Sequence, residues 1–446
     1  MSWGNWFTRL FGRKREPYVS PFWSGALGPR QRQDEDVHYV ESVECFGDLG
    51  EDLFGVMVDN ESDVIVYGAK GEGKTKLVHN ALRRVPRDFT VVVPDTTGRY
   101  AGYVDYHSPY PINVVELNSE SLPAVLEEAY AVAGMPGVIS PTMAQNLDTL
   151  VSWLLGLQPP QGLDVSKYPR TLSGLISLAE ASVSEGVFQG SLVESVMALV
   201  RRLKFVRHWL VDYETHPIIK RLLNGELRGK SVGIDLSILK RGIRMWFYTI
   251  ALLNAILDSN LTNVIVVIDE AHLFLRSQLS VLNDLMRVGR NYNIYFVLIS
   301  QAPQHFPPDV WSEDKIFIEF PIPFISFMDV LRRRPSYKYA LGEEDVPGIR
   351  TRGELEEHWR DIHTAMAIIK PTTPKMKECL GAGMTMMPVK VDVEVQPKPN
   401  AVTLRRCVES VAPGRVDDVV RVIERQGFSY AQFANEARAV WECIGA

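Results

Sequence analysis

Long apolar runs are missing from this sequence of 446 residues. The longest candidate, residues 245–257, lies between Arg244 and Asp258 and is shorter than the roughly eighteen residues that a membrane span requires. The N-terminus has no smooth apolar stretch followed by small residues, so no secretory signal is expected. Internal repeats and low-complexity tracts are also absent. These absences argue against a membrane-spanning protein and against a repeat architecture.

Cysteine is scarce, with Cys45, Cys379, Cys407 and Cys443 scattered along the chain. None of them forms a Cys-x-x-Cys pair, which argues against a structural metal site or a redox motif. We expect buried or inert thiols, as in a protein of a reducing, ATP-containing compartment.

Net basic charge is missing too, since the formal net charge is -6 and the isoelectric point is near 5.9. The chain therefore lacks the simple signature of a nucleic-acid binder, although positive charge is needed only where nucleic acid is contacted. With 46% hydrophobic and 23% charged residues, the composition is that of a soluble globular protein with a large core. The length predicts two or three domains, or one large α/β domain with insertions.

Apolar runs of strand length alternate with helical patterns. We expect strands at residues 63–67, 89–93, 112–117, 231–235, 264–268, 294–300, 315–320 and 365–369. Such alternation predicts an α/β fold with a mainly parallel sheet covered on both faces. The expected organisation is a core in two parts (37–118 and 229–385), a large helical insertion (119–228), and an extended segment followed by a small helical C-terminal region (386–446).

The first residues of the chain are unusual. An aromatic stripe at helical spacing is combined with basic residues: Trp3, Trp6, Phe7, Leu10 and Phe11 with Arg9, Arg13, Lys14 and Arg15. Interfacial membrane helices have this composition, so residues 1–15 predict docking at a membrane surface or channel. The alternative is a helix that packs on the protein itself or on a partner. Residues up to 36 are expected to be a linker.

Residues 68–75 read Gly-Ala-Lys-Gly-Glu-Gly-Lys-Thr and match the phosphate-binding loop pattern at every fixed position. The loop follows an expected strand and precedes an expected helix, which is the context that supports the motif. Glycines allow backbone N–H groups to face phosphates, the lysine reaches the β- and γ-phosphates, and the threonine hydroxyl binds Mg²⁺. The sequence therefore predicts an ATP site formed by Gly68, Gly71, Gly73, Lys74, Thr75 and Lys76.

A second acidic element follows the β-branched run at 264–268. Asp269 is placed to hold Mg²⁺, and Glu270 is placed to orient or deprotonate the attacking water. Either residue could instead cap the next helix, where negative charge is favourable. Gln301 ends another expected strand, and we expect it near the γ-phosphate; the alternative is an ordinary loop residue.

These residues, taken together, resemble the HerA/FtsK superfamily of DNA-translocating ATPases. The resemblance rests on Asp-Glu-Ala-His at 269–272, Gly-Arg at 289–290 and Ser-Gln-x-Pro at 300–303. It covers about residues 60–305 and, more weakly, residues up to about 370. Residues 93–100 and 231–237 are also similar, although Arg99 stands where the family usually has glutamate. The resemblance implies a RecA-like P-loop NTPase core, a hexameric ring and an arginine finger from a neighbour, with Arg290 as first candidate and Arg287 as second.

The chain has little room before residue 68 for the β-barrel of the family's repair-type members. The favoured function is an ATP-driven hexameric DNA translocase that powers DNA transfer across a membrane, in the cytoplasm or peripheral at the inner face of the cell membrane. Alternatives are a viral genome-packaging ATPase, a pilus or secretion assembly ATPase that does not handle DNA, and a structural nucleotide-binding protein. Basic clusters at 83–84, 201–207 and 332–334 are candidates for DNA contact or simply solvated surface.

Overall fold

In the computed structural model the chain divides after Asp36, and all the described residues belong to the second unit, Val37–Ala446. They are residues 37–40, 43–113, 115, 122–123, 126–127, 139–207, 215–239, 242–259, 261–272, 286, 288–306, 308–311, 314–321, 364–392, 394–398, 401–426 and 434–445. The predicted segment 1–15, its linker, Arg287 and the basic cluster 332–334 lie outside this set. No helix within it is long and apolar enough to span a bilayer.

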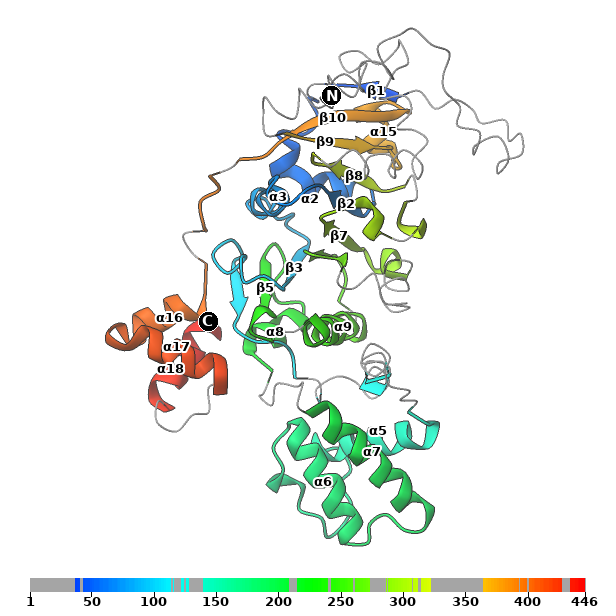
Figure 1. Ribbon diagram of the computed structural model, residues 1–446, viewed down its shortest axis with the longest axis vertical. Coiled ribbons are helices and arrows are strands. Elements are labelled where there is room, and N and C mark those ends of the chain that lie inside the picture. The colour runs from blue at the N-terminus through cyan, green and yellow to red at the C-terminus, as the bar shows by residue number, and fades with distance from the viewer. Residues whose placement is uncertain are drawn as a thin grey trace, which may run out of the picture. The chain divides into compact units, whose positions relative to one another are not determined.

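One ten-stranded sheet organises the second unit, in the order β1-β10-β9-β8-β2-β7-β6-β3-β5-β4 (Figure 1). Its strands are β1 (Val37–Tyr39), β2 (Val64–Tyr67), β3 (Thr90–Asp95), β4 (Tyr106–Ser108), β5 (Ser231–Asp235), β6 (Val264–Ile268), β7 (Ile294–Ser300), β8 (Ile316–Glu319), β9 (Thr364–Ile369) and β10 (Met384–Lys390). Only β9 runs against the others, since it pairs antiparallel with both β8 and β10. The predicted α/β fold with a mainly parallel, RecA-like P-loop core is confirmed.

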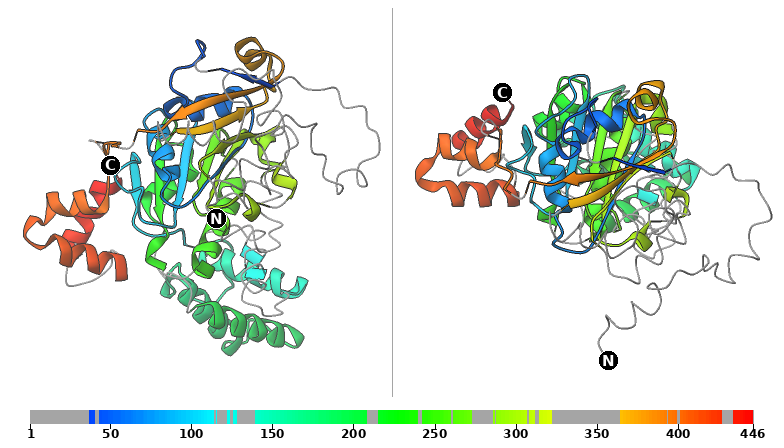
Figure 2. Two further views of the ribbon diagram at one scale, coloured as in Figure 1. Left: turned by 45° about the horizontal axis from the view of Figure 1, so that its top comes forward. Right: turned by 90° about the horizontal axis from the view of Figure 1, so that it is seen from above.

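Alternate residues of the central strands face two different hydrophobic clusters, because successive side chains of a strand point to opposite faces. Val64 and Val66 pack with helices α2 (Leu49–Asp59) and α3 (Lys74–Ala81). Ile65 and Tyr67 pack in the cluster that contains helix α9 (Gly242–Asp258). Helices therefore cover both faces of the sheet (Figure 2), which explains why strands β2, β6 and β7 are continuously apolar.

The remaining helices form two groups. In the predicted insertion, α5 (Pro141–Leu154), α6 (Leu172–Ser184) and α7 (Ser191–Arg207) pack against one another, and α8 (Pro217–Leu223) follows. After α15 (Pro374–Leu380), the C-terminal region contains α16 (Leu404–Val411), α17 (Val416–Gln426) and α18 (Ala434–Gly445). Hydroxyl caps begin several of these helices, since Ser140, Thr171 and Thr403 each accept a hydrogen bond from an N–H in the first turn.

One expectation about strands was wrong, and strands β1, β4 and β10 were not predicted. The described residues of the segment 112–117 are not in a strand, because side chains take its hydrogen bonds: the N–H of Asn113 donates to Thr215, and the N–H of Val115 donates to Asn113. A short strand, β4, lies just upstream instead. Strand β10 runs through Pro388 to Lys390 and pairs with β1 and β9.

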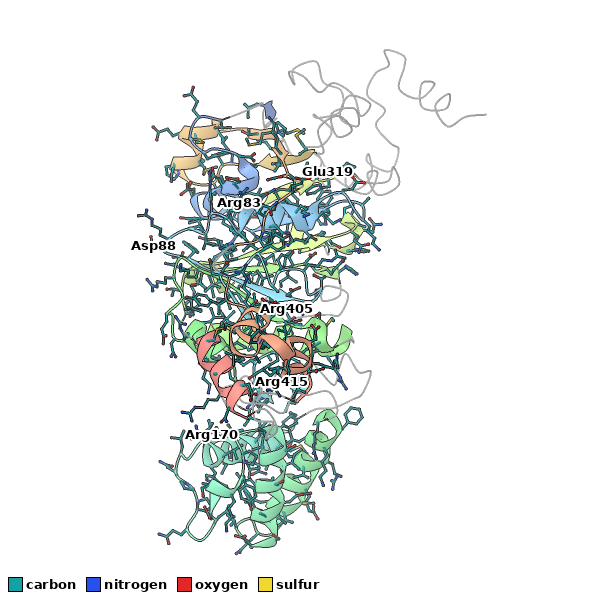
Figure 3. All side chains as sticks on the ribbon, turned by 90° about the vertical axis from the view of Figure 1, so that its left-hand side faces the viewer. Arg83, Asp88, Arg170, Glu319, Arg405 and Arg415 are labelled. Atoms are coloured by element: carbon teal, nitrogen blue, oxygen red, sulfur yellow. A yellow bond between two sulfur atoms is a disulfide. The ribbon has the colours of Figure 1, made fainter. Side chains whose placement is uncertain are left out.

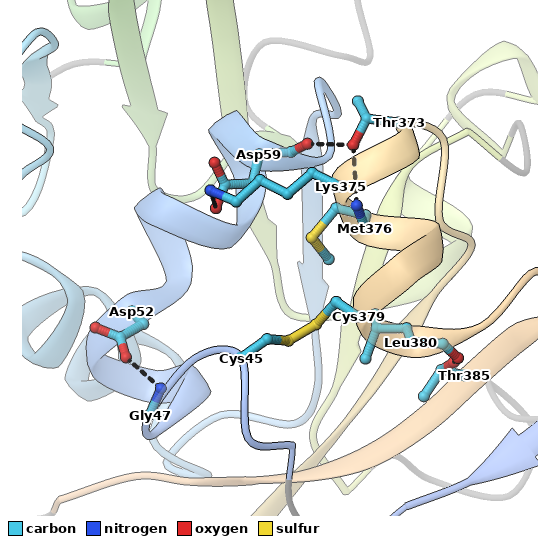
Figure 4. The surroundings of a disulfide bond; sticks show 10 residues. All are labelled: Cys45, Gly47, Asp52, Asp59, Thr373, Lys375, Met376, Cys379, Leu380 and Thr385. Atoms are coloured by element: carbon cyan, nitrogen blue, oxygen red, sulfur yellow. Dashed lines mark hydrogen bonds and ion pairs between the residues drawn. A yellow bond between two sulfur atoms is a disulfide. The ribbon is translucent and has the colours of Figure 1, made fainter.

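All four cysteines are paired, which overturns the expectation of inert free thiols. Cys45, before α2, bonds to Cys379 of α15 (Figure 4), and Cys407 of α16 bonds to Cys443 of α18. The Cα atoms lie 5.9 Å and 5.7 Å apart in the two pairs, within the usual range for disulfides. Two short contacts accompany the first pair: Thr373 donates to the carbonyl of Asp59, and Lys375 forms an ion pair with its carboxylate. Sequence spacing could not reveal pairs formed only by tertiary contact.

Candidate nucleotide-binding site

The glycine-rich loop joins β2 directly to α3. A side chain at Gly68 would place its Cβ 2.3 Å from the Cβ of Phe320, so only glycine fits there. Gly73 precedes the helix with φ of 107°, a conformation that glycine adopts without steric cost. Gly73 caps the helix with no side-chain hydrogen bond, so no capping side chain competes with an anion for the first-turn N–H groups.

Lys74 is buried and bends back over the loop. Its Nζ donates to the carbonyls of Gly68 at 2.7 Å and Ala69 at 2.6 Å. Burial lowers the pKa of Lys74, while the nearby charges of Asp269 and Glu270 oppose that shift. The ammonium thus lies between the loop and the acids, where a nucleotide phosphate would meet it. Gly71 lies exposed in the loop, and Lys76 is half-buried on α3.

Asp269 follows β6 and is 5% exposed. Its Oδ2 accepts from the hydroxyl of Thr75 at 3.2 Å and from the hydroxyl of Tyr100 at 3.0 Å, and its Oδ1 accepts from the N–H of Glu270 at 2.9 Å. Burial raises the pKa of Asp269, and the charge of Glu270 adds to that rise. The described residues give Asp269 hydrogen-bond donors but no ion pair.

Glu270 has φ of 56°, which is uncommon for a residue other than glycine and is a conformation concentrated at functional sites. Both of its carboxylate oxygens accept from Nε2 of Gln301, at 3.0 Å and 3.1 Å. Strand β7 lies between β2 and β6, and its carboxyl end carries Gln301. The parallel order therefore brings the loop, the acidic pair and this glutamine to the same edge of the sheet, where open α/β sheets bind ligands.

Three neighbouring side chains were missed by sequence reasoning. Nδ1 of His272 lies 3.2 Å from Oε2 of Glu270, and its ring lies 4.8 Å from the ring of His305. Tyr100 contacts Asp269 as described above. A histidine two residues after the acidic pair was the only available signal for His272; the positions of His305 and Tyr100 depend on loops folding back to the edge.

The oxygen set suits a magnesium ion. Mg²⁺ is usually held by one or two carboxylates together with substrate phosphates and water. Thr75 offers a hydroxyl and Asp269 a buried carboxylate oxygen 3.2 Å from it, beside a loop built for phosphates. These residues fit the predicted ion, which would neutralise the buried carboxylate and orient the phosphates.

Arg290 does not join this group. It lies in a short 3-10 turn (Gly289–Tyr292) at the amino end of β7, where its guanidinium contacts Asp314 at 2.6 Å and Asp63 at 3.8 Å. Asp63 precedes β2, so this cluster lies at the opposite edge of the sheet from the glycine-rich loop. A role for Arg290 in hydrolysis would therefore have to be played at the site of another subunit.

The basic clusters that were candidates for DNA contact differ in their pairing. Arg83 and Arg84 form ion pairs with Glu51 and Asp52 near the start of α2. On α7, Lys204 pairs with Glu180, whereas Arg201 is exposed. Two arginines of the C-terminal helices, which were not among these candidates, are labelled in Figure 3. Arg405 pairs with Glu409 and Asp417, and Arg415 pairs with Glu436.

The strand order and the site together define a RecA-like P-loop NTPase fold. Solved structures with a similar fold include VirB4 of Thermoanaerobacter pseudethanolicus (13% identity, 74% of this chain and 89% of that chain, TM-score 0.44). A plasmid coupling protein, TrwB, in complex with ADP and Mg²⁺ is similar at 14% identity (77% and 88%, TM-score 0.39). The genome packaging NTPase B204 of Sulfolobus turreted icosahedral virus 2 is similar at 9% (74% and 96%, TM-score 0.30). No protein-family model and no curated protein matches the chain.

Proposed function

We propose that the chain is a Mg-ATP-dependent motor ATPase that translocates DNA. The observation that carries the ATPase part is the pair of hydrogen bonds from Gln301 to Glu270. Gln301 follows β7, which lies between the strand before the glycine-rich loop and the strand before Asp269. This arrangement provides a base for water beside a glutamine that can respond to the γ-phosphate. Lys74 would bind the β- and γ-phosphates, and Thr75 and Asp269 would hold Mg²⁺, which supplies charge neutralisation at the phosphates.

The DNA part of the proposal rests on the residues that resemble the HerA/FtsK superfamily. We propose a homo-hexameric ring in which Arg290 of one subunit acts at the ATP site of the next. Residues 1–15 would dock the ring at a membrane surface or channel, at the inner face of the cell membrane, where it would drive DNA transfer.

A second function, an assembly or secretion ATPase without DNA, is favoured by one observation. Arg83 and Arg84, which were candidates for DNA contact, are neutralised by acidic residues of the same unit. The exposed Arg201 and Arg207 on α7 are then the remaining described candidates for phosphate contact.

Steady-state ATPase measurements with and without double-stranded DNA test both functions, with Lys74→Ala as the inactive control. We expect stimulation by DNA that fades as salt is added, because phosphate contacts release counterions. Turnover that needs Lys74 but ignores DNA would support the assembly ATPase instead. Turnover that survives Lys74→Ala would contradict the ATP site itself.

Glu270→Gln tests the catalytic role directly. The variant should bind nucleotide like the wild type, while kcat falls by about 10²- to 10⁴-fold, the usual contribution of a positioned general base. Glu185→Gln, at an exposed position after α6, is the matched control. An unchanged rate in Glu270→Gln would point to a structural nucleotide-binding protein.

A further inference from the structure

The loop after β3 is built around one buried carboxylate. Oδ1 of Asp95 accepts from the N–H groups of Thr97, Gly98 and Arg99, at 3.0, 2.7 and 3.2 Å, and Oδ2 accepts from the N–H of Tyr100 at 2.9 Å. Asp95 is fully buried. Because one side chain satisfies four successive backbone donors, the loop has a single defined path, and the backbone of Tyr100 is fixed.

The ring of Tyr100 is fixed by the helix that begins with Lys74 and Thr75. His79 of α3 meets Tyr100 edge to face, with centroids 5.1 Å apart at 83°. The same imidazole stacks on Tyr103, with centroids 3.6 Å apart at 6°. Tyr100 is fully buried, so its hydroxyl has a defined direction.

That hydroxyl donates to Oδ2 of Asp269, the oxygen that also accepts from Thr75. The N–H of Glu270 holds the other oxygen. A hydroxyl can offer its oxygen to Mg²⁺ and still donate its proton, so Thr75 would stay a donor to Asp269 with the ion bound. Tyr100 adds a second side-chain donor on the same oxygen, and it would fix the rotation of the Asp269 carboxylate from a residue that is not itself a metal ligand.

We propose that Tyr100 is a positioning residue for the metal site: its hydroxyl holds the Asp269 carboxylate in the orientation that binds the magnesium ion of Mg-ATP. The proposal rests on the proposed ATP site. Phosphate binding and metal binding can then be tested separately, because the loop and Lys74 would bind the phosphates, whereas Tyr100 would act only through the metal ligand Asp269. Partners of metal ligands typically change metal affinity by about 10- to 100-fold when removed.

Tyr100→Phe in the full chain tests this, with ADP binding measured by calorimetry in EDTA and across a Mg²⁺ series, and Mn²⁺ binding measured by electron paramagnetic resonance. We expect ADP affinity in EDTA to match the wild type and the metal affinity of the ADP complex to fall about 10- to 100-fold. Tyr295→Phe is the matched control, because Tyr295 is also buried but is the second residue of β7, near the opposite edge. Melting temperatures of the two variants check that both fold.

Wild-type metal affinity in Tyr100→Phe would overturn the proposal. Equal losses of ADP affinity in EDTA and in Mg²⁺ would also overturn it, because they would show that the hydroxyl only supports the loop. Failure of the wild-type chain to bind ADP under either condition is a different result, which would refute the ATP site and the metal site together.

Discussion

Asp63 at the amino edge of the central sheet and Asp269 at its carboxyl edge are both buried, and their charges are balanced in different ways. At the amino edge, Asp63 accepts from Lys315 Nζ at 2.9 Å and from the N–H of Phe296 at 2.9 Å, with Arg290 nearby. At the carboxyl edge, the hydrogen bonds that described residues give to Asp269 come from neutral groups, the hydroxyls of Thr75 and Tyr100 and the N–H of Glu270. A buried charge is costly unless it is paired. The charge of Asp63 is therefore balanced by cationic side chains of the chain itself. The site of Asp269 is instead suited to a cation from outside the chain.

Arg290 allows a direct test of this comparison. It contacts Asp63 and Asp314 at the amino edge, and we also propose that it acts at the ATP site of a neighbouring subunit. Arg290→Ala should lower kcat by about 10³-fold or more, the usual contribution of an arginine finger, while nucleotide binding remains. Asp314→Asn is the control, since it removes the partner at 2.6 Å and keeps the guanidinium. If Arg290→Ala lost stability but kept its rate per folded molecule, Arg290 would belong to the amino-edge cluster alone.

Asparagine substitutions compare the two aspartates directly. Asp63→Asn leaves Lys315, which is 7% exposed, without its carboxylate, and breaking a buried pair in this way costs about 3–5 kcal/mol of unfolding free energy. Urea unfolding at pH 7, without nucleotide or metal, measures it.

Asp269→Asn should behave in the opposite way. Because burial raises the pKa of Asp269 in the folded state, that state binds more protons than the unfolded chain between the two pKa values, and stability falls as pH rises through this window. The asparagine variant should thus be at least as stable as the wild type at pH 7, and the difference should vanish below about pH 4. Equal destabilisation by the two substitutions would contradict the comparison.

Removing a disulfide should lower the stability of the folded chain without changing the contacts of Asp63 or Asp269. The expected effect is smaller than that of Asp63→Asn. Replacing Cys407 and Cys443 by serine should lower the free energy of unfolding by about 2–4 kcal/mol, with no change in ATPase rate per folded molecule. Urea unfolding with and without dithiothreitol measures the same quantity in the wild type. Four thiols reacting freely in the untreated folded protein would restore the original expectation of unpaired cysteines.

The sequence predicted the central strands well because their signal is local. Strands β6 and β7 have the predicted bounds, since continuous β-branched and apolar runs are typical of strands buried on both faces. Segment 112–117 looked similar but is not a strand in its described residues, because Asn113 and Thr215 capture its backbone donors. Side-chain competition of this kind is not visible in a hydrophobic pattern.

The site was predictable to the extent that its residues follow strand ends. The structure places Thr75, Asp269, Glu270 and Gln301 together because parallel strands bring their carboxyl ends to one edge. Their roles stay predictions. Tyr100 and His305 reach the same edge through loops, and the partners of Arg290 are distant in sequence, so no spacing rule could identify them.

The chain after β10 returns across the whole sheet. From Lys390 it passes Asn80, which donates to the carbonyl of Asp392, and reaches β4, where Val402 accepts from the N–H of His107 and donates to the carbonyl of Asp105. Eight strand spacings separate β10 from β4 in the sheet order, or about 38 Å at about 4.8 Å each. The segment also turns on the way, since the N–H of Ala401 donates to the carbonyl of Lys398. It therefore joins two distant strands of the sheet order, and deleting two of its residues should weaken the hydrogen bonds of Val402 with Asp105 and His107.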